Sequence, residues 1–64
     1  MRVFVSVYRK EKGLSQEDLA KCVNVRRETI CRLEQGRYMP SLKLAVDISK
    51  TLNIPIEKLF EFPD

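Results

Sequence analysis

Arginine is the residue type of this chain best suited to specific polar recognition. Four arginines fall between positions 26 and 37. A guanidinium group can donate two parallel hydrogen bonds to the O6 and N7 atoms of a guanine. Charge is also uneven along the chain, since residues 1–37 hold nine Lys or Arg and five Asp or Glu, whereas residues 38–64 hold three and four. The first half is therefore the better candidate for contact with a polyanion, although solvated helices often carry such an excess.

The other reactive residue types do not form a catalytic or metal-binding set. The chain has no histidine, and no serine or cysteine has an evident base near it in the sequence, so we do not expect an enzyme. Cys22 and Cys31 are too few to close a tetrahedral zinc site within one chain. We expect no metal, no cofactor and two reduced thiols, with a redox role left open.

Membrane insertion and export are not expected either. The longest uninterrupted apolar runs, such as Val3-Phe4-Val5, are far short of the roughly 20 residues that span a bilayer. We also expect no signal peptide. A cytoplasmic protein of a single domain over residues 1–64 is the expectation.

Helix start and stop signals precede the arginines. Gly13 can close a first helix in a left-handed conformation. Ser15, with Asp18 three residues later, is typical of an N-terminal cap, so a helix is expected from Gln16. Asn24 tolerates the left-handed backbone of a tight turn and ends that helix.

The next helix, over about residues 27–35, carries the arginines. Ile30 and Leu33 lie three residues apart and face inward, so the Arg side chains point outward. Gly36 closes this helix, and Arg26 takes the position of its N-cap, for which it is a poor residue. Two short helices joined by a tight turn, with Arg on the outer side of the second, are physically suited to reading DNA.

Further helices are expected towards the C-terminus. Ser41 can cap a helix that ends at Asn53, and a last short helix follows Ile54-Pro55. Residues 61–64 are expected to be frayed or docked on a partner. The apolar side of the helix after Ser41 is expected to comprise Leu42, Ala45, Val46, Ile48, Ser49 and Leu52.

The N-terminal segment supports two interpretations. Val3, Val5 and Val7 alternate with other residues, which favours a strand. Val5 and Tyr8 are three apart and favour a helix that begins at residue 3 or 4, which is the preferred interpretation. Whether residues 3–7 are helix or strand stays open, and the fold class is all-α with five helices.

The combined motifs resemble the phage Cro and repressor family, also called Xre-like helix-turn-helix regulators. The likeness runs from about Val5 to Phe60. It implies a lambda-repressor-like domain with its motif at about residues 16–35, whose third helix enters the major groove of a palindromic operator. The residues that carry it are Gly13-Leu14-Ser15-Gln16-Glu17-Asp18-Leu19-Ala20, Val25, Thr29-Ile30, Leu33-Glu34-Gln35-Gly36 and Pro40-Ser41-Leu42.

The resemblance also implies roles for individual residues. The residues expected to read bases are Arg27, Glu28 and Arg32, with Cys31 bordering them. Those expected to hold the DNA backbone are Gln16, Arg26, Thr29, Arg37, Tyr38 and Lys43. Arg9 and Glu34 match a structural ion pair between the first and third helices.

Simpler interpretations of these residues stay open. Arg27 and Arg32 can be solvated helix charges. Glu28 can accept from cytosine N4, favour the helix N-terminus or pair with Arg32. Arg26 either contacts phosphate or leaves its helix weakly capped.

Apolar side chains near both ends of the chain are candidates for a homodimer interface, unless they fold back on their own domain. These residues are Val3, Phe4, Val5, Ile56, Phe60 and Phe62. Double-stranded DNA is the expected partner, and a sequence-specific transcriptional regulator, with repression as the leading role, is the expected function. The alternative is an antitoxin-type interaction module that also regulates its own operon.

Overall fold

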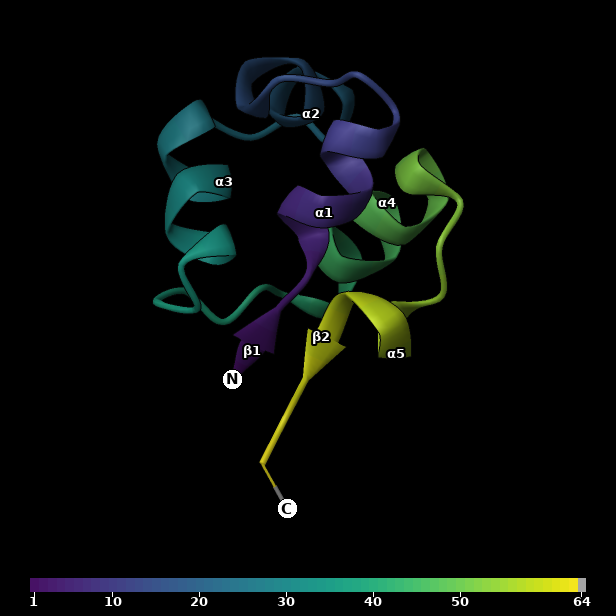
Figure 1. Ribbon diagram of the computed structural model, residues 1–64. Coiled ribbons are helices and arrows are strands. Elements are labelled where there is room, and N and C mark those ends of the chain that lie inside the picture. The colour runs from purple at the N-terminus through teal and green to yellow at the C-terminus, as the bar shows by residue number, and fades with distance from the viewer. Residues whose placement is uncertain (64) are drawn as a thin grey trace.

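Five helices and one pair of short strands form the computed structural model, which describes residues 1–63 (Figure 1). The helices are α1 (Val5–Glu11), α2 (Gln16–Cys22), α3 (Arg27–Glu34), α4 (Leu42–Leu52) and α5 (Ile56–Leu59). The strands β1 (Arg2–Val3) and β2 (Phe60–Glu61) are antiparallel, with Arg2 opposite Glu61 and Val3 opposite Phe60. The expected five-helix fold is confirmed, with a small strand pair added where the two ends of the chain meet.

The N-terminal segment contains both of the elements that its sequence suggested. A strand over Arg2–Val3 precedes α1, and Phe4 is the residue before that helix. The expectation of a helix from residue 3 or 4 was therefore wrong by one or two residues. The physical reason is that the C-terminal segment returns to the start of the chain, where the Phe4 N–H donates to the carbonyl of Leu59 at 2.8 Å. Asp64, the last residue of the expected tail, lies outside the described residues.

Local capping groups set the ends of α2 and α4. The Asp18 N–H donates to Ser15 Oγ and the Ser15 N–H donates to the Asp18 carboxylate, both at 3.0 Å, which is a complete capping box. Ser41 Oγ accepts a backbone N–H of α4 at 3.1 Å. Asn24 and Asn53 have φ values of 59° and 58°, so each takes the left-handed conformation that ends a helix. The sequence signals at these four positions are confirmed.

One apolar core fills the space between the helices. Its buried members are Val5, Leu19, Ala20, Val23, Ile30, Leu33, Leu44, Ala45, Ile48, Leu52, Leu59 and Phe60. Two of these, Val5 at 0% and Phe60 at 4% exposure, were expected as dimer contacts. That expectation is corrected, because the strand pair turns the C-terminal segment back and both side chains pack inside their own chain.

The apolar side of α4 also differs from its expected composition. Leu42 is 78% exposed, whereas Leu44 is buried with Ile48 and Leu52. These buried residues recur at intervals of four, so they share one side of the helix. Leu42 follows the Ser41 cap directly and begins the first turn, where its side chain points to solvent.

Candidate nucleic-acid interface

Helix α3 buries one side in the core and turns the other to solvent. Ile30 and Leu33 are fully buried, while Arg27 and Arg32 are exposed. The left-handed turn at Asn24 connects α3 to α2, with which it packs closely. The pair therefore has the arrangement of a helix-turn-helix unit with a free outer side.

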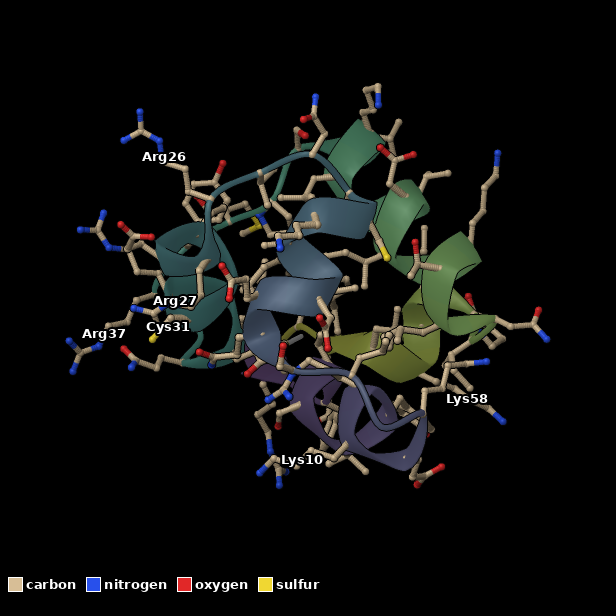
Figure 2. The ribbon with its side chains drawn as sticks, turned by 90° about the horizontal axis from the view of Figure 1, so that it is seen from above. Lys10, Arg26, Arg27, Cys31, Arg37 and Lys58 are labelled. Atoms are coloured by element: carbon tan, nitrogen blue, oxygen red, sulfur yellow. The ribbon has the colours of Figure 1, made fainter. Side chains whose placement is uncertain are left out.

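Cationic side chains project from this outer side. Arg26, Arg27 and Arg37 extend in the same general direction, and Cys31 lies on the same side of the molecule (Figure 2). Lys58 extends from the opposite side of the molecule (Figure 2). These three arginines thus gather on one side of the molecule, while Lys10 and Lys58 extend from other sides (Figure 2).

An open hollow of about 500 Å³ lies along the outer side of α3. Three guanidinium groups and one carboxylate surround it, so its charge is positive. Such a hollow attracts an anionic partner and presents donors to hydrogen-bond acceptors on that partner. Its lining residues are Arg27, Glu28, Cys31, Arg32, Gln35 and Arg37.

The hollow brings together some of the predicted site residues and not others. All three expected base readers line it, and so does Arg37, which was expected on the DNA backbone. The lining does not include Gln16, Arg26, Thr29, Tyr38 or Lys43. Gln35 was not singled out from the sequence, although its spacing of four residues from Cys31 and eight from Arg27 would have indicated it.

The residues that were expected to contact the DNA backbone but lie outside the hollow have different surroundings. Arg26 is the exposed N-cap residue of α3 and makes no capping hydrogen bond with its side chain. Lys43 Nζ lies 2.7 Å from Asp47 Oδ2, four residues on along α4, and its side chain is exposed. Tyr38 is exposed and Thr29 is half-buried. Of these residues, Arg26 offers a free cation next to the outer side of α3.

A buried polar network supports the helices behind this surface. Arg9 Nε donates to Glu34 Oε2 at 2.7 Å, and Arg9 Nη2 donates to Glu34 Oε1 at 3.2 Å. The two side chains are 8% and 7% exposed, and Arg9 Nη1 also donates to the carbonyl of Leu14 at 2.8 Å. The ion pair between α1 and α3 that the sequence suggested is thus present.

Gln16 is tied to this network. Its Nε2 donates to Glu34 Oε1 at 3.0 Å, so Glu34 accepts hydrogen bonds from both α1 and α2. A neutral amide nitrogen carries two N–H groups, and the second remains available to another acceptor. The position of the Gln16 side chain is therefore set by the same carboxylate that holds Arg9.

The part of the chain that the structure describes holds neither a metal-binding cluster nor a membrane-spanning helix. Within residues 1–63, no cluster of three or more His, Cys, Asp or Glu could hold a metal ion. None of the helices described there is long and apolar enough to cross a bilayer. Cys22 and Cys31 are both free thiols.

Known proteins resemble this chain in both sequence and fold. The family model HTH_3, described as helix-turn-helix, matches residues 7–59. An uncharacterized HTH-type transcriptional regulator of Archaeoglobus fulgidus is 52% identical over 64 residues, which are 100% of this chain and 91% of the relative.

Two solved structures match at the level of the fold. The restriction-modification controller protein C.AhdI from Aeromonas hydrophila has a TM-score of 0.79 and 32% identity, covering 88% of this chain and 85% of that chain. The N-terminal DNA-binding domain of SinR from Bacillus subtilis has a TM-score of 0.79 and 27% identity, covering 91% of this chain and 86% of that domain. These neighbours confirm the lambda-repressor-like fold class.

Proposed function

Since this chain belongs to the Xre-like helix-turn-helix family of transcriptional regulators, we propose that it is a sequence-specific repressor whose α3 reads the major groove of double-stranded DNA. The observation that carries this proposal is the hollow on the outer side of α3, with three arginines in its lining. A domain that occupies its operator excludes other proteins from the same DNA, which is the simplest route to repression. The antitoxin-type alternative gains no support from the relatives and is not proposed.

The contacts divide into two classes by chemistry. Base edges in the major groove are read by hydrogen bonds, for which we propose Arg27, Glu28 and Arg32. Phosphates are held by cations and neutral donors without regard to sequence. For that role we propose Gln16, Arg26, Thr29, Arg37, Tyr38 and Lys43.

A homodimer on a palindromic operator completes the proposal. Two copies related by a two-fold axis would present their α3 helices to half-sites about one helical turn apart. Such a regulator acts where the chromosome is, which is the cytoplasm in bacteria and archaea. Catalysis is not part of the proposed role.

Selection of bound duplexes from a random pool tests the function directly. We expect one enriched site with two-fold symmetry. Arg27→Ala should then weaken binding to that site by about 5- to 100-fold and relax the choice at one base pair. Arg37→Ala should weaken binding to all sequences similarly and reduce the salt slope by about one.

Lys58→Ala is the matched control, because Lys58 projects from the opposite side of the molecule (Figure 2). This variant should bind the selected site as the unaltered protein does. A pool with no enriched sequence would refute the proposed function. Equal behaviour of the Arg27 and Arg37 variants would refute only the division into base and backbone contacts.

A further inference from the structure

We propose that Gln35 is a further specificity-determining residue, which reads an adenine in the major groove and is oriented for this contact by the thiol of Cys31. The inference rests on the proposed function, since Gln35 can reach a base only when the outer side of α3 faces DNA. It adds a residue to the base-reading set and names the base that this residue recognises.

Gln35 is the C-cap residue of α3, and its backbone keeps the right-handed helical conformation, so it extends the ridge of the helix surface that carries Arg27 and Cys31. The three positions are four residues apart, and residues at this spacing line up on one side of a helix. All three line the hollow on the outer side of α3. Ile30 and Leu33 bury the opposite side of the helix, so the ridge is directed away from the core.

The length of this ridge suits several base pairs. Eight residues of helix rise by about 12 Å, and neighbouring base pairs are about 3.4 Å apart. Arg27 and Gln35 can therefore face base pairs about three to four steps apart in one half-site when the helix axis follows the groove. Gln35 thus reads a position that Arg27 does not reach.

The hydrogen bond between Gln35 and Cys31 determines which donor and acceptor groups of Gln35 remain for a DNA base. Gln35 Nε2 lies 3.5 Å from Cys31 Sγ and donates to it. A primary amide has two N–H groups and one carbonyl oxygen, so one N–H and Oε1 remain for a partner. This contact directs the amide nitrogen towards the preceding helical turn and thereby favours one orientation of the amide.

The remaining donor and acceptor match adenine. In the major groove adenine offers the N7 acceptor beside the N6 amino donor, and glutamine pairs with both at once. Guanine offers two acceptors, N7 and O6, so Oε1 would face another acceptor there. Because the contact is neutral, it changes base preference without changing the number of counterions released.

Binding to variants of the selected operator tests the inference. At one A·T pair of each half-site, replacement by G·C should weaken binding of the unaltered protein by about 5- to 100-fold. Gln35→Ala should lose this discrimination and keep the same salt slope. Substitution of that adenine by 7-deazaadenine, which lacks the N7 acceptor but still pairs with thymine, should weaken the unaltered protein at least about threefold and leave Gln35→Ala unaffected.

Cys31 variants test the orienting role separately. Cys31→Ser keeps a hydrogen-bond acceptor at this position and should retain most of the preference for adenine, whereas Cys31→Ala should lose part of it at unchanged thermal stability. Uniform weakening of all sequences by Gln35→Ala, or equal behaviour of the two Cys31 variants, would overturn the corresponding part of the inference. An enriched site that is read without Gln35 contradicts this inference alone, whereas a pool with no enriched site contradicts the proposed function.

Discussion

Glu34 is the residue on which the relative positions of three helices depend. Its carboxylate accepts two hydrogen bonds from Arg9 of α1 and one from Gln16 of α2, while Glu34 itself ends α3. A charge buried to this extent is stable only with its partner, because removing one member leaves the other without compensation.

Removal of either charge of this pair should destabilise the fold more than it alters base preference. We expect Arg9→Ala and Glu34→Ala each to lower the free energy of unfolding by about 3–5 kcal/mol. The double variant should lose less free energy of unfolding than the two single variants lose together. The reason is that each single change already removes the interaction between the two side chains, so the sum counts it twice. Denaturant melts of the three variants measure this, and strictly additive losses would mean that the two side chains do not interact.

Asp18 makes the start of α2 sensitive to acid. Hydrogen bonds from the backbone N–H of Ser15, and then from its side chain, hold the pKa of the Asp18 carboxyl below its ordinary value of 3.8. The folded state therefore releases this proton more readily than the unfolded state does. The resulting stabilisation is fully present above pH 3.8 and is lost as the pH falls through the lowered pKa of the folded state.

Asp18→Ala should reveal this dependence. The variant should be less stable than the unaltered protein near neutral pH, and the difference should shrink as the pH falls below 3.8, the ordinary pKa of the carboxyl. Thermal melts of both proteins across an acid pH series measure the difference. A difference that stays constant with pH would mean that the charge of Asp18 does not contribute.

Helix α3 begins without a side-chain cap, as α1 and α5 also do. Serine side chains cap α2 and α4 with hydrogen bonds, whereas the Arg26 side chain gives α3 none. Arg26→Ser should supply the missing acceptor and raise the free energy of unfolding by about 0.5–2 kcal/mol. If Arg26 holds a phosphate, the same change should weaken binding to all DNA and lower the salt slope by about one. Higher stability with unchanged DNA binding would identify Arg26 as no more than a poor cap.

The ends of α2 and α4 could be predicted from the sequence because they depend on neighbouring groups. Ser15 and Ser41 cap the residues that directly follow them, and Asn24 and Asn53 take left-handed conformations at turns. The strand pair could not be predicted, because it joins Arg2 to a residue 59 positions away. Only the tertiary fold brings these two segments together.

The candidate site likewise has features that the sequence predicts and features that only the tertiary structure shows. The outward position of Arg27 and Arg32 follows from the buried spacing of Ile30 and Leu33, which the sequence shows directly. The bond from Gln16 to Glu34 depends on how α2 packs against α3, and no local pattern indicates such a contact. Gln35 was missed for a different reason, since the sequence argument followed charge rather than the ridge of the helix.

For the molecule as a whole, a single α3 would supply few base contacts in the proposed complex, at about 1–3 kcal/mol for each good pair. Non-specific attraction to phosphate competes with so small a preference. Two copies on one operator double the specific contacts. We propose that such pairing uses the surface where β1, β2 and α5 lie together, near the two ends of the chain (Figure 1).

Apolar groups remain accessible at these joined ends even though Val5 and Phe60 are in the core. Phe62 is 53% exposed and, with Met1 and Pro63, borders a hollow of about 200 Å³ that Arg2 and Glu61 also line. Val3, Phe4 and Ile56 are half-buried. A second copy of this chain could cover Phe62 together with these neighbours, which would remove apolar surface from water and stabilise a dimer.

Sedimentation at micromolar concentration should therefore find a homodimer, and Phe62→Ser should shift it towards monomer. The monomeric variant should keep its fold, since Phe62 lies outside the core, but should bind the two-fold operator more weakly than the unaltered protein. Met39→Ser is the matched control, because Met39 is also exposed and apolar but belongs to the loop between α3 and α4; it should remain a dimer. A monomer both free and on operator DNA would end the dimer proposal, whereas a Phe62→Ser protein that stays dimeric would move the interface to another surface.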